Sequence, residues 1–457
     1  MAFKLHSYQA KAAEFAINNY IVKNNPGVAL IKDPGLGKTL TSLYIINMLR
    51  DLGEVSKVLL VAPLRVCKLV WPLEVSKWGF DFTVASLHGK KLLPKEVADI
   101  ELINFESLSK LEPYAGRWDF LLVDEVSKLK SWTSVRTKSM RKMLPSFRRR
   151  LVLTGTPVSE GCQDVFVPIY ICDNGERLGK NVTVFRSRFL RQEVPARGMA
   201  HWGKWVAKEG SRDEIISRIS DIAYRVGEEE LAGMPELVVN DILCELPAKA
   251  KNGYNKLKRD LLLQLESGDV FAANAASAYA KCKQYAGGAV YDEAKEAHEV
   301  HDAKLEAMLE LHEEIGSRQL LIFYNYKHER DRLRKLMPGC KVIDGESPKK
   351  ELVSVVEAWV AGKIERLVCQ VQSTSHGLNL QGHCNNVAYF SMPDSLDNYE
   401  QSYRRVHRQG AKNTHTKVFR LITRGTVDEV VRDRVDGKHK SQQEFLQCLR
   451  NHARQTA

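Results

Sequence analysis

Near its N-terminus the chain reads Asp33-Pro34-Gly35-Leu36-Gly37-Lys38-Thr39. This stretch follows an apolar run at 28–31 and precedes a helical pattern at 40–49, the strand, loop and helix order that a phosphate-binding loop requires. Glycines let successive backbone N–H groups surround phosphates, and the helix N-terminus adds a partial positive charge. The stretch therefore predicts binding of a nucleoside triphosphate, with Lys38 on the β- and γ-phosphates and Thr39 as a ligand of Mg²⁺.

The spacing of this loop departs from the usual G-x4-G-K-[ST] pattern at one position. A first glycine is expected where Lys32 stands, and Gly35 supplies the nearer glycine. Taken alone, the motif also allows a turn that holds an incidental lysine. We take Asp33, Gly35 and Gly37 as the nucleotide-binding candidates of the loop, together with Lys38 and Thr39.

Two later strand ends also carry polar residues. The run 118–123 predicts a buried strand that ends in Asp124 and Glu125, and the run 150–153 ends in Thr154-Gly155-Thr156-Pro157. In nucleotide hydrolases the first carboxylate of such a pair holds Mg²⁺ and the second orients or deprotonates the attacking water. A solvated acidic turn is the alternative. Because ligands bind at the carboxyl edge of parallel α/β sheets, we expect the three strand ends to share one edge.

Five motifs occur in a fixed order along nearly the whole chain, from residue 5 to about residue 429. They are the loop at 33–39, Val-Asp-Glu-Val-Ser-Lys-Leu-Lys at 123–130, Leu-Thr-Gly-Thr-Pro at 153–157, Ser-Thr-Ser-His-Gly-Leu-Asn-Leu-Gln at 373–381, and Gln-x-x-x-Arg-x-His-Arg-x-Gly at 401–410. In this order they resemble motifs I, II, III, V and VI of superfamily 2 helicases. The Swi/Snf-type branch fits best for three reasons. In motif II, Ser-Lys-Leu-Lys follows Asp-Glu after Val126, motif III reads Leu-Thr-Gly-Thr-Pro, and motif VI contains His-Arg-Gln-Gly.

The resemblance implies an α/β fold with two RecA-like parallel-sheet lobes in tandem and a mostly helical insertion or linker between them. The expected boundaries are 1–172 for the N-terminal ATP-binding lobe, 173–300 for the helical insertion and linker, 301–430 for the C-terminal helicase lobe, and 431–457 for a helical tail.

The resemblance also implies roles for single residues. Gln9 is similar to the glutamine that reads adenine, and the motif VI residues Gln401, Arg405 and Arg408 are similar to residues that reach the γ-phosphate. The implied catalytic set is Lys38, Asp124, Glu125, Arg405 and Arg408, with ATP and Mg²⁺ as cofactors. The implied DNA-contacting and coupling residues are Arg65, Asn104, Ser107, Thr154, Thr156, Ser373, Thr374 and Asn379. Arg65 is equally consistent with a surface charge at a helix start.

Composition indicates the class of partner and the compartment. Lys and Arg number 68 against 56 Asp and Glu, so the net charge is +12, which favours a polyanionic partner, although a solvated basic surface is an alternative. The nine cysteines show no paired C-x-x-C spacing, which argues against a zinc module and suits a reducing compartment. No apolar run is long enough to cross a bilayer and the N-terminus lacks a signal-peptide core, so we expect a cytoplasmic protein of a bacterial or phage-infected cell with no membrane partner.

Together these features predict an ATP-dependent translocase of the Swi/Snf type that moves along DNA, with duplex favoured. The alternatives are a strand-separating DNA or RNA helicase and the motor subunit of a nuclease or restriction-type complex. No acidic cluster with a following lysine stands out elsewhere in the sequence, so a nuclease activity would need a partner protein; a replication or repair protein is another candidate partner. A non-catalytic nucleic-acid clamp is disfavoured because the whole catalytic set is present.

Overall fold

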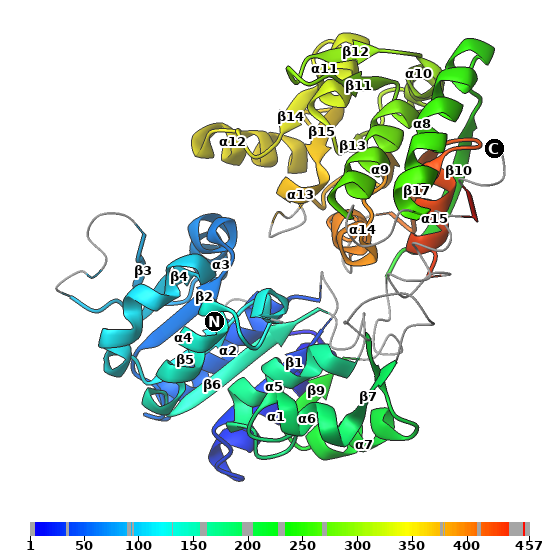
Figure 1. Cartoon of the computed structure of the whole chain (residues 1–457). Helices are drawn as coiled ribbons and strands as arrows, with labels where there is room; N and C mark the ends of the chain where they lie inside the picture. Colours follow the sequence, from blue (N-terminus) through cyan, green and yellow to red (C-terminus); the bar gives the residue numbers. More distant parts are fainter. Residues whose placement is uncertain are drawn as a thin grey trace. The chain divides into compact units, whose positions relative to one another are not determined.

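The computed structural model describes residues 5–32, 36–88, 93, 96–129, 131–155, 162–193, 204–226, 234–266, 272–374, 378, 380–408, 413–437 and 451–452 (Figure 1). The chain divides into two compact units. We call residues 1–195 with 201–232 the N-terminal lobe, and residues 233–457 with 196–200 the C-terminal lobe. Within this described part, no helix has both the length and the apolar character that crossing a bilayer requires.

The N-terminal lobe is built on a sheet with the strand order β3-β4-β2-β5-β6-β1-β9. Every neighbouring pair runs parallel, and the register places Leu151 of β6 between Val28 of β1 and Leu122 of β5. The central strands are continuous apolar runs because both faces of a parallel sheet are covered. The strands are β1 (Gly27–Ile31), β2 (Val58–Ala62), β3 (Val84–Ser86), β4 (Ile100–Asn104), β5 (Phe120–Val123), β6 (Arg149–Thr154) and β9 (Ala223–Arg225).

Helices cover both faces of this sheet. Leu60 of β2 packs with helices α1, α2 and α3, whereas its neighbours Leu59 and Val61 pack on the opposite face with α4 to α7. This alternation follows from the period of two in a β-strand. The helices are α1 (Ser7–Ile21), α2 (Lys38–Asp51), α3 (Trp71–Trp78), α4 (Val135–Met143), α5 (Phe166–Asp173), α6 (Val182–Phe189) and α7 (Ser211–Ile219), and a hairpin pairs β7 (Leu190–Glu193) with β8 (Lys204–Ala207).

The C-terminal lobe has a second parallel sheet with the order β10-β17-β16-β13-β15-β14. Met308 and Leu311 of α10 pack on Leu320 and Ile322 of β13. The strands are β10 (Glu236–Cys244), β13 (Leu320–Tyr324), β14 (Lys341–Ile343), β15 (Arg366–Gln370), β16 (Asn386–Tyr389) and β17 (His415–Thr423), with a separate hairpin of β11 (Ala289–Tyr291) and β12 (Ala297–Glu299). The helices are α8 (Ala248–Glu266), α9 (Ala272–Ala286), α10 (Ala303–Ile315), α11 (Lys327–Leu336), α12 (Lys349–Val360), α13 (Val371–Thr374), α14 (Leu396–Tyr403) and α15 (Val427–Val435).

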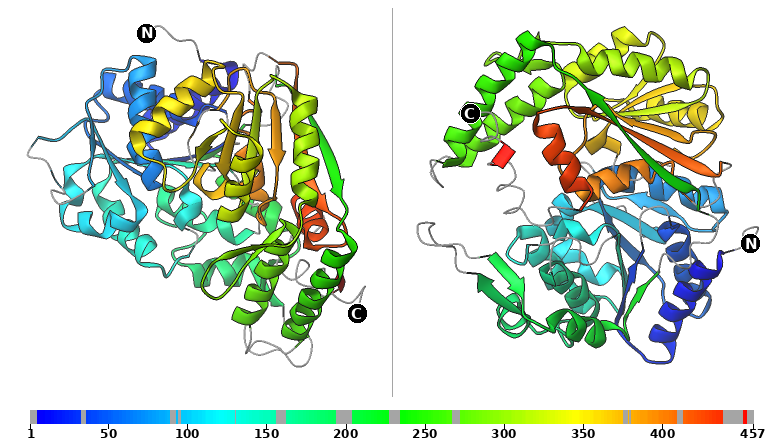
Figure 2. Two further views of the ribbon diagram at one scale, coloured as in Figure 1. Left: turned by 90° about the horizontal axis from the view of Figure 1, so that it is seen from above. Right: turned by 90° about the vertical axis from the view of Figure 1, so that its right-hand side faces the viewer.

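The expectation of two parallel-sheet α/β lobes is confirmed by both strand orders (Figure 2). The segment 173–300, expected to be mostly helical, contains α6 to α9 and also the strands β7 to β12 in its described part. Strand β9 extends the first sheet beside β1, and β10 extends the second sheet beside β17 over its full length. This segment thus supplies an edge strand to each lobe. The four-part division into 1–172, 173–300, 301–430 and 431–457 remains a prediction.

A buried ion pair joins α10 to α15 within the C-terminal lobe. Lys304 Nζ lies 2.6 Å from Asp428 Oδ2, and the two side chains are 1% and 4% exposed. Lys304 also donates to the carbonyl of Phe390 at 2.9 Å, and the Thr423 amide donates to Asp428 at 3.1 Å. Removing one partner of such a pair leaves an uncompensated buried charge, which costs about 3–5 kcal/mol.

We therefore expect Asp428→Asn to lower the free energy of unfolding of the C-terminal lobe by about 3 kcal/mol. Urea denaturation, with hydrogen exchange of α10 as the local probe, measures this. Glu346→Gln is the matched control, because Glu346 pairs with Lys327 where the side chains are 67% and 62% exposed, and an exposed pair contributes about 0–1 kcal/mol. If both variants lost the same free energy of unfolding, burial would not explain the contribution of the Lys304–Asp428 pair.

Candidate active site

Three strand ends of the N-terminal lobe meet at one edge of its sheet. The order β5-β6-β1 makes these strands neighbours, and they run parallel. Lys32 after β1, the acidic pair after β5 and Thr154 at the end of β6 therefore share the carboxyl edge, and Figure 1 shows these strands in one sheet. The expectation that these strands deliver polar residues to one edge is confirmed.

The loop after β1 leads directly into α2. Gly37 precedes this helix with φ of 64°, in the left-handed region that glycine adopts without strain. Lys38 and Thr39 are the first two residues of α2, so their amides belong to the helix N-terminus, where unpaired N–H groups bind anions. Asp33 and Gly35 lie outside the described residues.

Gln9 lies against this loop although it comes from a different helix. Its side chain is 3% exposed, and its Oε1 accepts the His6 amide at 2.9 Å, which fixes it at the first turn of α1. A Cβ atom on Gly37 would collide with Gln9 Nε2. The glycine thus allows a close approach of Gln9 that no other residue type would allow. The adenine-reading role of Gln9 remains a prediction.

Lys32, which stands where the usual pattern has its first glycine, is fully buried at the end of β1. Its Nζ donates to Thr41 Oγ1 at 2.8 Å, and Thr41 in turn donates to the carbonyl of Gly37 at 3.1 Å. The Lys32 amide donates to the carbonyl of Thr154 at 3.0 Å. Lys32 therefore ties the first turn of α2 to the sheet, a role that the sequence pattern did not indicate.

The acidic pair after β5 lies close to the start of α2, with Asp124 buried and Glu125 half-buried. Asp124 is 8% exposed, and burial, reinforced by the adjacent charge of Glu125, raises the pKa of its carboxyl above the ordinary value. The charge of Lys38 and a hydrogen bond from Trp71 oppose this rise in pKa. The backbone of Glu125 has φ of 60°, which is uncommon outside glycine and concentrates at functional sites.

The donor chemistry at this edge fits Mg²⁺. The hydroxyl of Thr39 and the carboxylate of Asp124 are oxygen ligands, which this ion prefers, and Mg²⁺ typically takes one or two carboxylates together with substrate phosphates. A buried carboxylate such as that of Asp124, whose pKa is raised by burial and by an adjacent negative charge, is also stabilised by a divalent cation. Thr39 and Asp124 are thus the residues that would hold the metal.

The motif VI residues lie in the C-terminal lobe, on α14 and the turn that follows it. Gln401 is 2% exposed and its Nε2 donates to Asp397 Oδ1 at 2.8 Å. Arg405 is 6% exposed and its Nη1 lies 3.5 Å from the carbonyl of Leu378. Arg408 is half-buried, and its Nε donates to the carbonyl of Arg404 at 2.8 Å. All three expected residues therefore sit on one short segment of the second lobe.

Family models match most of the chain in two segments. The model described as the SNF2-related domain matches residues 8–286, and the helicase conserved C-terminal domain matches residues 303–410. The chain belongs to the SNF2-related family. The resemblance to the Swi/Snf branch of superfamily 2 is confirmed, and the chain is a nucleic-acid-dependent ATPase of this family.

Relatives of this SNF2-related protein differ in length. It is 31% identical over 438 residues to protein p41 of Acyrthosiphon pisum secondary endosymbiont phage 1, covering 91% of this chain and 93% of p41. It is 22% identical to the ISWI chromatin-remodeling complex ATPase ISW1 of Saccharomyces cerevisiae, covering 97% of this chain but only 41% of ISW1. The solved Sulfolobus solfataricus SWI2/SNF2 ATPase core in complex with dsDNA is 20% identical, with a TM-score of 0.47 and coverage of 98% and 93% of the two chains.

Three DNA-contact candidates of the SNF2-related chain lie at or just after the ends of strands of the first sheet. Arg65 is half-buried and precedes a π-helical turn, Val66–Val70, a type of turn that often marks functional sites. Asn104 is 7% exposed and its Nδ2 donates to Glu106 Oε2 at 2.8 Å. Ser107 is half-buried in the 3-10 helix that begins at residue 105. Contacts of these residues with DNA remain predictions.

The remaining coupling candidates are described only in part. Thr154 is 4% exposed at the end of β6. Thr156 and Asn379 lie outside the described residues, and of Ser373 and Thr374 the structure gives the backbone alone, at the end of α13. Their coupling roles also remain predictions.

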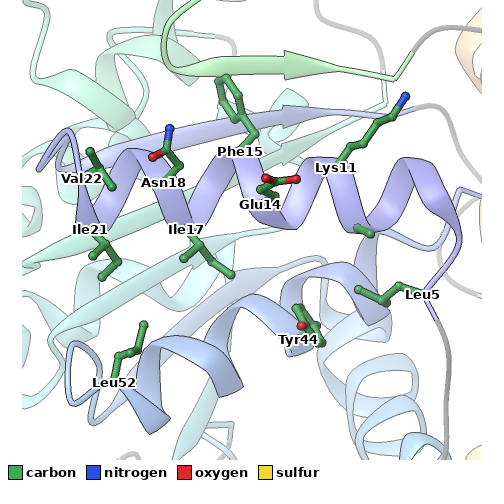
Figure 3. A pocket seen from close by; sticks show the side chains of 11 residues that line it. Leu5, Lys11, Glu14, Phe15, Ile17, Asn18, Ile21, Val22, Tyr44 and Leu52 are labelled. Carbon is green, nitrogen blue, oxygen red and sulfur yellow. The ribbon is translucent and has the colours of Figure 1, made fainter.

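A groove of about 760 Å³ lies along α1 and α2 of the N-terminal lobe (Figure 3). The side chains that face it include Ile17 and Ile21 of α1, Tyr44 of α2, and Leu52, which directly follows α2. None of the expected nucleotide-site residues lines this groove. The groove is therefore separate from the residues that we expect to bind the nucleotide.

Proposed function

We propose that this chain couples ATP hydrolysis to movement along duplex DNA, as a Swi/Snf-type translocase. The observation that carries the proposal is the arrangement at the edge of the first sheet. There the buried carboxylate of Asp124 lies close enough to Lys38, the first residue of α2, for the lysine charge to act on its pKa. A helix N-terminus beside a buried aspartate and its half-buried glutamate neighbour is the arrangement that nucleotide hydrolysis needs.

In the proposed reaction Lys38 and the first-turn amides of α2 bind the β- and γ-phosphates. Thr39 and Asp124 would hold Mg²⁺, which neutralises charge that develops on the transferring phosphoryl group. Glu125 orients the attacking water and accepts its proton. Arg405 and Arg408 of the second lobe stabilise the γ-phosphate in the transition state.

Residues of both lobes would then act on one nucleotide, so ATP binding favours closure of the lobes and hydrolysis releases them. Repeated closing and opening of the lobes can move two surfaces that bind backbone phosphates along a DNA strand. Contacts to the DNA backbone suit this movement because they carry no sequence information.

Two observations favour DNA as the track. The chain carries a net charge of +12, which suits a polyanion. The relative ISW1 is a chromatin-remodeling ATPase. We further propose that a nuclease or a replication or repair protein acts with this chain, in the cytoplasm of a bacterial host cell that the phage relative p41 suggests.

The nature of the track can be tested by nucleic-acid stimulation of the ATPase. We expect duplex DNA to stimulate turnover more than single-stranded DNA or RNA, and to do so largely independently of base sequence. The apparent affinity for duplex should fall steeply with salt, because each neutralised phosphate contributes about −0.9 to the slope of log affinity against log salt. Stronger stimulation by RNA would replace the DNA assignment with an RNA helicase.

Movement without strand separation can be tested separately. We expect displacement of a triplex-forming strand from duplex DNA in the presence of ATP, and no obligatory unwinding of a forked duplex. Lys38→Ala, which removes the phosphate contact, is the control for ATP dependence. Robust fork unwinding without triplex displacement would overturn the translocase proposal in favour of a strand-separating helicase.

A further inference from the structure

A hydrogen bond connects helix α3 to the acidic pair. Trp71, the first residue of α3, is fully buried, and its Nε1 donates to Asp124 Oδ2 at 3.0 Å. The two residues are 53 positions apart in the chain. The bond therefore depends on the packing of α3 on the sheet, where Trp71 contacts the apolar side chains of the strands.

The bond from Trp71 matters because it reaches the Asp124 carboxylate from another element of the fold. The Asp124 amide donates to the carbonyl of Val61 at 2.9 Å, which holds the backbone, and the Glu125 amide hydrogen-bonds the carboxylate from the next residue. The indole N–H is a donor only, so it interacts favourably with the ionised carboxylate. Because Oδ2 accepts the hydrogen bond from Trp71, we assign Oδ1 to the metal ion.

We propose that Trp71 is a positioning residue of the Mg²⁺ site, whose indole N–H holds Asp124 Oδ2 so that the other carboxylate oxygen stays oriented toward the metal. The inference rests on the proposed function in one respect, namely that Asp124 binds the Mg²⁺ that accompanies the nucleotide. Groups that hydrogen-bond a metal-binding side chain typically change metal affinity about 10–100-fold when they are lost.

The same helix provides a matched control. Trp78, at the other end of α3, is half-buried, and its Nε1 donates to Glu74 Oε2 at 2.6 Å. As in the bond from Trp71 to Asp124, an indole N–H donates to a carboxylate. Glu74, however, lies one turn away on the same helix and is not at the end of a strand. Trp78→Phe removes the same chemical group from the same helix without touching the acidic pair.

The experiment is calorimetric titration of the full chain with ADP, first in EDTA and then at increasing Mg²⁺ concentrations, without DNA. For Trp71→Phe we expect the ADP affinity in EDTA to be unchanged. Mg²⁺ should still increase the ADP affinity, but the Mg²⁺ concentration at which this increase is half-maximal should rise about 10–100-fold. Trp78→Phe should match the wild type in both conditions. Binding of Mn²⁺ to the ADP complex, followed by electron paramagnetic resonance, reports the same metal affinity directly.

Loss of the buried indole can also disturb packing, so a second replacement separates the two effects. Benzothienylalanine at position 71 keeps the shape of the ring and replaces the N–H by sulfur. If the proposal is correct, this variant shows the same shift in Mg²⁺ dependence as Trp71→Phe. Its thermal midpoint stays at the wild-type value.

Two results would overturn the proposal. One is an unchanged Mg²⁺ dependence with benzothienylalanine at position 71. The other is an equal loss of ADP affinity with and without Mg²⁺, which would mean that Trp71 acts through packing alone. A wild-type chain that binds no ADP, with or without Mg²⁺, would instead remove the nucleotide site itself, and the proposed function with it.

Discussion

Replacing Lys38 by alanine should abolish productive binding of ATP, whereas Glu125→Gln should keep binding and stop turnover. Lys38 begins the helix whose N-terminus faces the strand edge, and truncating one partner of a buried charge contact costs about 2–5 kcal/mol or more. Glutamine preserves the shape of Glu125 but cannot accept the proton of the attacking water. General base catalysis contributes roughly 10²–10⁴-fold, so kcat should fall by that factor.

Equilibrium binding of a slowly hydrolysed ATP analogue, together with steady-state ATPase rates, distinguishes the two variants. The controls are Lys142→Ala and Glu112→Gln, which break an ion pair of 2.9 Å on the surface of the same lobe. These controls should leave both binding and turnover unchanged. Normal hydrolysis by both Lys38→Ala and Glu125→Gln would disprove the assignment of the site.

Alanine at Arg405 or at Arg408 should lower turnover by about 10³-fold or more and change nucleotide affinity little. An arginine that meets charge developing on the γ-phosphate contributes to the transition state and not to the ground state, so kcat falls while binding persists. Lysine at either position should not restore the rate, because it lacks the planar fork of donors.

Arg404→Ala is the control for this segment. Arg404 pairs with Glu400 one turn earlier at 3.4 Å, and the carbonyl that Arg408 uses belongs to the backbone and survives the substitution. We expect near-normal turnover for this variant. Normal turnover of both Arg405→Ala and Arg408→Ala, with a lowered thermal midpoint, would instead give motif VI a packing role, consistent with the near-complete burial of Arg405.

The sequence by itself determined the parts of the fold whose signals are local. The apolar runs before Lys32, Asp124 and Thr154 are strands in the structure, and the helix after Gly37 begins at Lys38. Short connections and continuous apolar strands follow from the requirement that both faces of a parallel sheet be buried. The order of the motifs was sufficient to identify the family.

The edge strands could not be predicted in the same way. Strand β9 spans only Ala223–Arg225, too short for a period to be recognised. Most of β10 is exposed, so it lacks the buried apolar run that identifies a central strand. Both lie in a segment that we expected to be mostly helical, and pairing with β1 and β17 decided their conformation.

Only the tertiary structure decided which side chains support the site. Trp71 and Asp124, Lys32 and Thr41, and Lys304 and Asp428 are partners because folding brings their elements together. A spacing pattern identifies residues that act through local backbone geometry, as in the phosphate loop. It cannot identify the donor that holds a carboxylate from another helix, because that bond depends on how the helix packs on the sheet and on the burial that makes an unsatisfied carboxylate costly.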